Sequence, residues 1–105
     1  MNFTDGMMQT FKGFLKGDTQ LLAEIQNHPF TLSATSWHFT LPTLHAFMGA
    51  QAPLFSELNY KQFRQQLFHS PINEYLKLLN GKIIIIDNQY HVDVTTYALS
   101  RIKKV

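Results

Sequence analysis

Four consecutive isoleucines, Ile83–Ile86, are the feature that most restricts the fold of this chain. β-Branched residues favour strands, and the polar pair Asp87–Asn88 that follows suits a two-residue hairpin turn. We therefore expect a hairpin in which Lys82 faces Asp93 across the strands, a favourable pairing of opposite charges. Because an isoleucine strand on a free edge invites aggregation, we expect it to be covered on both faces or paired with a third strand from 30–40.

Two segments with helical periodicity precede the isoleucine run. Tyr60–Phe68 carries apolar residues on one face, and Asn59 is placed to cap its first turn. Ser70–Asn80 begins with a serine suited to the N-cap and a proline suited to the first helical position, and Gly81 is placed to end it. A proline-led segment over 41–50 predicts another helix upstream. The expected order is therefore helix, helix, helix and hairpin.

The remaining segments complete one α+β domain. Apolar residues at helical spacing predict an N-terminal helical extension over 4–27, divided at Gly17. Thr96 is placed to cap a last helix within 96–104, whose basic end suits the helix dipole. We therefore expect a small helical domain of about five to six short helices with a C-terminal β-hairpin, in which 30–95 forms the central unit.

Composition limits the environment and the chemistry. The chain has no cysteine, which excludes disulfides, thiolate metal sites and thiol catalysis. No apolar run approaches the ~18 residues of a transmembrane helix, and the N-terminus lacks the basic start of a signal peptide, so we expect a cytoplasmic protein without a membrane partner. Only 15% of the residues are charged. Such a surface indicates a concealed protein interface, a homodimer included, or a surface solvated by uncharged polar side chains instead.

No motif in the chain indicates catalysis or a cofactor. The five histidines are scattered and the seven acidic residues are dispersed. His91 and Asp93 share one face of the expected strand, but a metal site would need more ligands converging on them. A nucleophile elbow, a phosphate-binding glycine loop and a dinucleotide fingerprint are all missing from the sequence. We therefore expect a protein that is not an enzyme and that holds no metal or cofactor.

The two halves of the chain differ in charge. Residues 1–57 hold two lysines against four acidic residues, a net charge of −2. Residues 58–105 hold seven lysines and arginines against three acidic residues, a net charge of +4. The basic half contains the two helices and the hairpin described above, as a surface that faces nucleic acid would require. An ordinary solvated surface with a basic tail is the alternative.

Residues 41–94 resemble the winged helix-turn-helix superfamily in the order of their expected elements. The resemblance implies a first helix at 41–50, a scaffold helix at Tyr60–Phe68, a recognition helix at Ser70–Asn80 and a β-hairpin wing that starts at Gly81. It also implies binding of double-stranded DNA. The candidate residues are those that would contact phosphate, Lys61, Arg64, Lys77 and Lys82, and one that would lie near the bases, Asn73.

A protein-interaction role is the other interpretation. Lys77 is the only cation that the expected recognition helix exposes, whereas DNA-binding interfaces are usually strongly basic. Trp37 and Phe55 are candidates for lining a partner groove, although a core position suits both. The sequence therefore predicts a small non-catalytic protein-interaction module or adaptor, which binds a protein partner or a second copy of itself. A winged-helix DNA-binding transcriptional regulator is the alternative.

Overall fold

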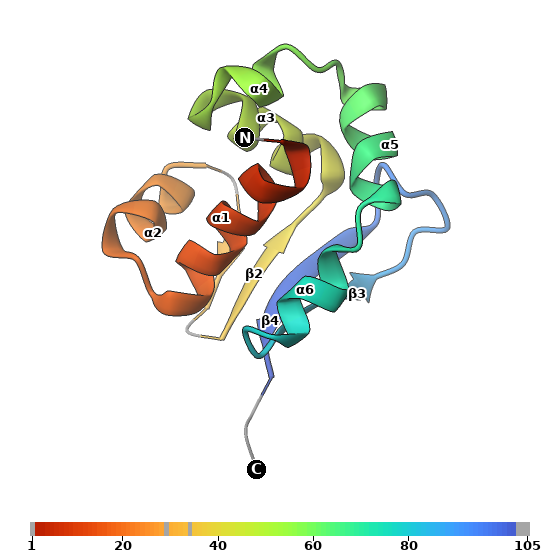
Figure 1. The fold of residues 1–105 in the computed structure, drawn as a ribbon. Helices are drawn as coiled ribbons and strands as arrows, with labels where there is room; N and C mark the ends of the chain where they lie inside the picture. The colour runs from red at the N-terminus through yellow and green to blue at the C-terminus, as the bar shows by residue number, and fades with distance from the viewer. Residues whose placement is uncertain (1, 29, 34, 103–105) are drawn as a thin grey trace.

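The computed structural model describes residues 2–28, 30–33 and 35–102. Within them the chain forms helices and a four-stranded antiparallel sheet, so the predicted α+β class is confirmed (Figure 1). The elements follow in the order α1 (Phe3–Lys16), α2 (Thr19–Gln26), β1 (Thr31–Leu32), β2 (Ser36–Phe39), α3 (Leu41–Gln51), α4 (Pro53–Ser56), α5 (Tyr60–His69), α6 (Ile72–Lys77), β3 (Gly81–Asp87) and β4 (Thr96–Arg101).

The strand order is β1-β2-β4-β3, with every neighbouring pair antiparallel. The expected strands within 30–40 exist, but β1 pairs with β2 and β2 pairs with β4, so neither of them pairs with the isoleucine strand β3. β3 therefore lies at an edge of the described sheet. The predicted hairpin register is wrong, because Lys82 faces Ser100 and not Asp93. Residues 88–95 form a loop in place of a two-residue turn and a returning strand.

The predicted C-terminal helix over 96–104 is also wrong, because residues 96–101 form β4, one of the two inner strands. Its alternation explains the outcome. Leu99 lies in register with Trp37 on the core face, whereas Ala98 and Ser100 point to the opposite face. The hydrogen bonds of β4 to a strand on each side outweigh the weak local preference for a helix that Thr96 and the basic end confer. The rest of that predicted helix, 103–105, lies outside the described residues.

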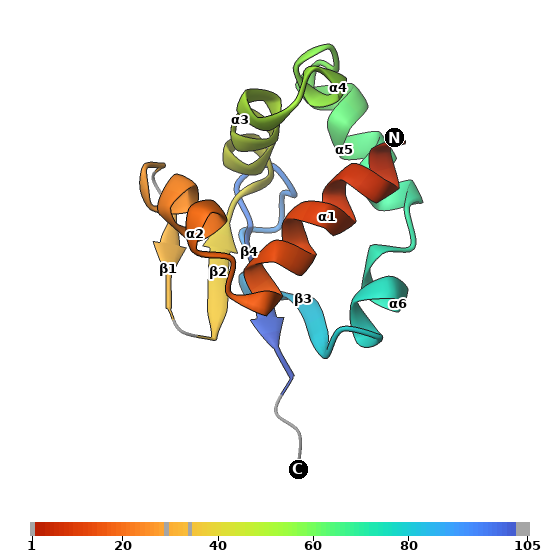
Figure 2. The ribbon, with the colours of Figure 1, turned by 60° about the vertical axis from the view of Figure 1, so that its left-hand side comes forward.

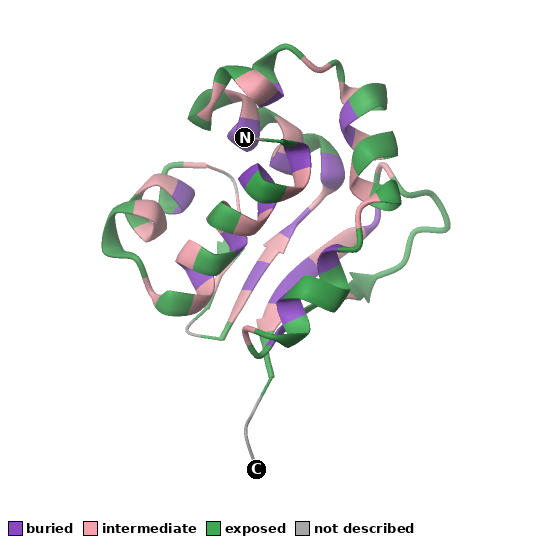
Figure 3. Cartoon of the chain, in the orientation of Figure 1, coloured by how far each residue is buried: buried purple, intermediate pink, exposed green. Residues whose placement is uncertain are grey.

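The core lies between the sheet and the helices, with α1 running over the sheet beside β2 and α3 at the end of that strand (Figures 1 and 2). Trp37 on β2 has an exposed fraction of 0% and contacts the aromatic rings of Phe11, Phe14, Phe30, Phe39 and Phe47. Phe55 packs against Phe3 and Phe63 in the same core. Figure 3 shows that buried positions gather where helices and sheet face one another. Trp37 and Phe55 are thus core residues, and neither presents a surface to a partner.

The ends of the helices show which of the predicted capping residues act as caps. Asn59 caps α5 through a reciprocal capping box with Gln62, as predicted for Asn59. The second of the two predicted helices is shorter than expected. Ser70 does not cap it, because its hydroxyl donates to the Gln66 carbonyl at 2.8 Å. Instead α6 begins at Ile72 and ends at Lys77, without a side-chain cap.

Candidate protein-interaction groove

An apolar groove opens between the edge strand β3 and the segment that joins α5 to α6. Its volume is about 430 Å³. Phe39 and Tyr97 contribute from the neighbouring strands β2 and β4. The remaining side chains that define it here come from the α5–α6 segment and from β3: Phe68, Ile72, Ile83 and Ile85. We refer to these six residues as the β3 groove.

The groove exists because the helices leave part of the core face of the sheet uncovered. Strand register places Trp37, Leu99 and Ile83 in one row on this face, and Phe39, Tyr97 and Ile85 in the next. The first row is well covered, since Trp37 and Leu99 are fully buried. In the second row, Ile85 is 56% exposed, and Phe68 across the groove is also 56% exposed. The hydrophobic core therefore reaches the surface at this edge.

The main chain of the edge strand is partly closed to further strand pairing. Arg101 directs its N–H to Thr35, on the β2 side of the sheet. In an antiparallel pair, the main-chain N–H and C=O groups of successive residues point alternately toward and away from the partner strand. Gly81 is paired with Arg101, so its main-chain groups point away from β4. The same holds for Ile83 and Ile85, which follow at intervals of two residues. The outward Ile83 N–H donates to Asn73 Oδ1 at 2.9 Å. A register shift between Ile85 and Asp87 then interrupts the ladder. Such features protect sheet edges from strand addition, so what this edge offers to another molecule is mainly its side chains.

This geometry fixes the position of one candidate for reading DNA bases. Asn73, on α6, uses its amide oxygen to bind the β3 main chain. One lone pair of that oxygen and the two N–H donors of the amide are then left for another partner. α6 itself packs against β3 and α1, so it belongs to the edge of the core.

The loop between β3 and β4 continues the apolar edge. It projects from the side of the molecule next to α5 (Figure 1). Tyr90 is 95% exposed at its tip and has a left-handed φ of 61°. Asn88 Oδ1 accepts from the Tyr90 N–H at 2.8 Å, and Thr95 Oγ1 accepts from the Gln89 N–H at 3.3 Å. Because Thr95 is buried, the second of these bonds ties the loop to the body of the domain, whereas the first is local to the loop.

A polar cluster fastens the same loop to α5. Arg64 donates to both oxygens of Asp93, at 3.0 and 3.2 Å, and the Tyr60 hydroxyl donates to Asp93 Oδ1. The Tyr60 hydrogen bond, with help from Arg64, lowers the pKa of Asp93 below its ordinary value. Burial and then the Asp93 carboxylate raise the pKa of Tyr60. Arg64, a predicted phosphate contact, thus serves a structural ion pair in this fold.

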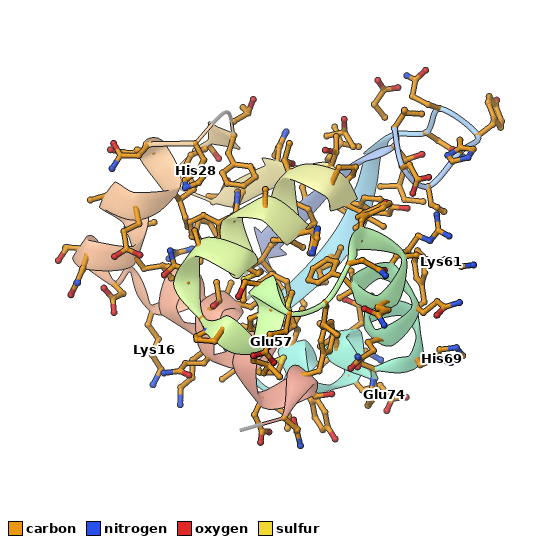
Figure 4. All side chains as sticks on the ribbon, turned by 90° about the horizontal axis from the view of Figure 1, so that it is seen from above. Lys16, His28, Glu57, Lys61, His69 and Glu74 are labelled. Atoms are coloured by element: carbon orange, nitrogen blue, oxygen red, sulfur yellow. The ribbon has the colours of Figure 1, made fainter. Side chains whose placement is uncertain are left out.

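The three other predicted phosphate contacts lie on different elements. Lys61 is on α5 and points away from the body of the molecule (Figure 4), whereas Lys77 ends α6 and Lys82 is on β3. All three are exposed, and no salt bridge links them to an acidic side chain within the described residues. Lys82 alternates with Ile83 and so lies on the sheet face opposite the β3 groove.

The structure offers little support for other site chemistry. His38 Nε2 lies 3.1 Å from Ser36 Oγ on the sheet face opposite the core, a distance that a nucleophile and its base would show. Neither residue lines one of the pockets described for the molecule, and Ser36 Oγ also bonds Ser33. Among the described residues, no three histidine, cysteine or acidic side chains converge as metal ligands. No helix described between residues 2 and 102 is long and apolar enough to cross a membrane.

Sequence reasoning missed the two exposed aromatic residues of this edge. Phe68 belonged to the apolar stripe expected to face the core, and helical periodicity alone does not show where the neighbouring layer ends. Tyr90 was expected inside a strand. The available signal was Asn88, whose side chain stabilises local turns. Comparison of the chain with protein-family models, curated protein sequences and solved structures returns no match.

Proposed function

We propose that this chain is a small non-catalytic protein-interaction module that binds an apolar segment of a protein in the β3 groove. The observation that carries the proposal is that the core opens at this edge between two half-exposed side chains, Phe68 and Ile85. The segment would present an aromatic or branched aliphatic side chain, because the groove walls are apolar. Ser70, Asn73 and Glu74 add polar groups to the lining, which matches the polar rim of protein interfaces.

The expected gain in binding free energy follows from the exposed area. Full burial of a phenylalanine or isoleucine side chain contributes about 1.5–3 kcal/mol. Phe68 and Ile85 are each about half exposed, so covering them would contribute about 1 kcal/mol each. The side chain of the partner would bury its own apolar surface as well. Side chains that enter a desolvated pocket are the ones that dominate binding energy in protein interfaces.

Selection from a peptide library displayed on phage tests this proposal. The chain is immobilised sparsely, so that copies cannot cover one another. We expect enriched peptides to share an aromatic or branched aliphatic residue and to bind Phe68→Glu at least tenfold more weakly. Leu78→Glu is the matched control, because Leu78 is an equally apolar surface residue, 83% exposed, that does not line the β3 groove. No enrichment, or equal binding by Phe68→Glu, would refute the proposal.

A DNA-binding regulator is the second candidate. It is supported by the exposed lysines of the basic half, Lys61, Lys77 and Lys82, and by the antiparallel pair β3–β4, which follows α6 where the winged-helix resemblance implies a hairpin. Phosphate contacts make such binding strongly salt-dependent. Titration of the chain with duplex DNA at several salt concentrations tests it. The candidate requires measurable affinity at low salt that falls as salt rises, and the lack of affinity at low salt would exclude it.

A further inference from the structure

We infer that the β3 groove is occupied by Tyr90 from a second copy of this chain. This inference rests on the proposed function, because it names the partner of the groove. Each copy would insert its own Tyr90 and accept that of the other. The result is a symmetric dimer in which the same edge is used twice.

Tyr90 has the properties of an inserted side chain. It is the most exposed large apolar residue of the described chain, at 95%. The loop that carries it is ordered by hydrogen bonds from its two ends, and the Asp93–Arg64 ion pair fixes it to α5. A non-glycine residue with positive φ has an energetic cost that the surrounding contacts must offset. The fold therefore holds an aromatic ring in solvent, where it makes little contact within its own chain.

The groove and Tyr90 lie on the same edge of the molecule. Tyr90 and Val92 line a second hollow that shares Ile85 and Tyr97 with the β3 groove. A two-fold axis placed between a projection and a neighbouring hollow brings each projection into the hollow of the other copy, which closes the assembly at two. Tyrosine suits this position, because its ring is apolar while its hydroxyl can reach a polar group at the rim, such as Glu74.

Charges along β3 favour the same arrangement. Lys82 lies near the beginning of the strand and Asp87 at its end, with the four isoleucines between them. Both are exposed. When the two-fold axis is perpendicular to β3, the two copies of this strand run antiparallel. Lys82 of each copy then approaches the Asp87 end of the other, along the sheet face opposite the β3 groove. Because Tyr90 follows Asp87 by three residues, the same alignment carries it toward the other groove. The net charge of +2 leaves little repulsion between copies.

Sedimentation equilibrium over a range of protein concentrations tests the dimer. We expect the wild-type chain to dimerise reversibly and Tyr90→Ser to raise the dimer dissociation constant at least tenfold. Leu78→Ser is the control, because it removes an exposed apolar side chain outside the β3 groove and should leave the constant unchanged. Lys82→Asp and Asp87→Lys should each weaken the dimer, and the double variant should recover affinity. Fluorescence of the buried Trp37 checks that each variant folds.

Cross-linking locates the inserted residue. A photoreactive benzophenone side chain in place of Tyr90 should couple to a peptide that contains Phe68 or Ile72 of the other copy, as identified by mass spectrometry with isotope-labelled and unlabelled chains mixed. A chain that is monomeric at every concentration, or a dimer indifferent to Tyr90→Ser, overturns this inference. If a monomeric chain still selects peptides through Phe68, only the partner assignment fails. If it selects none, the proposed function fails as well.

Discussion

Truncation of Leu99 to alanine should cost this domain a large part of its stability. Leu99 is fully buried at the centre of β4, in register with Trp37 on one side and Ile83 on the other. Hydrogen-bonded strands flank it, so the site cannot collapse around the missing atoms. We therefore place the loss in the middle of the range for leucine-to-alanine changes, at about 3–4 kcal/mol. Since domains of this size are stable by only about 5–15 kcal/mol, the loss is substantial.

Urea unfolding measures this loss directly. With a urea dependence of about 1.5 kcal/mol per molar, the midpoint should fall by about 2 M. Trp37 fluorescence and far-ultraviolet circular dichroism should report the same transition if unfolding is two-state.

Ser100→Ala is the matched control for this experiment. Ser100 follows Leu99 in the same strand, points to the opposite face and is only partly buried. Its stability should change by no more than about 0.5 kcal/mol, as for most surface substitutions. A cost below about 1 kcal/mol for Leu99→Ala, or similar costs for both variants, would refute the placement of β4 at the centre of the sheet.

Two further predictions concern the loop anchor and the end of α1. Because the pKa of Asp93 is lowered in the folded state, its contribution to stability is complete above the ordinary carboxyl pKa and is lost as the pH falls through the folded value. Asp93→Asn should therefore lose less stability than the wild type as the pH falls. Denaturation series between pH 2 and 6 would contradict this if the free energy of unfolding depended on pH equally in both proteins. Gly17→Ala should cost about 1 kcal/mol, because Gly17 has a φ of 74°, while Gly17→Asn should cost less; a thermal melt in which alanine matches glycine would exclude this reasoning.

The parts of the fold that could be predicted from the sequence depend on neighbours along the chain. Asn59 caps α5 and Asp18 caps α2, since each bonds main-chain groups two or three residues away. Strand partners could not be predicted in the same way. Thr96 is as suitable for capping a helix as for a strand, and only the ladders to β2 and β3 decide between them. The candidate groove was missed for a related reason, because it depends on where the helical layer stops over Phe68.

The isoleucine strand shows how these levels combine. A strand of four isoleucines aggregates easily when its main-chain groups are free, and β4 pairs with β3 on one side only. On the other side, Asn73 accepts from the Ile83 N–H, and the irregularity before Asp87, which lies in the pairing with β4, makes the end of the strand irregular. An added strand would have to displace the asparagine and cross the irregularity, so a partner gains little from main-chain hydrogen bonds here. What the edge still exposes is the side chains of Phe68 and Ile85. Recognition at this edge is therefore expected to depend on the shape and apolar character of an inserted side chain, which distinguishes it from binding by strand addition.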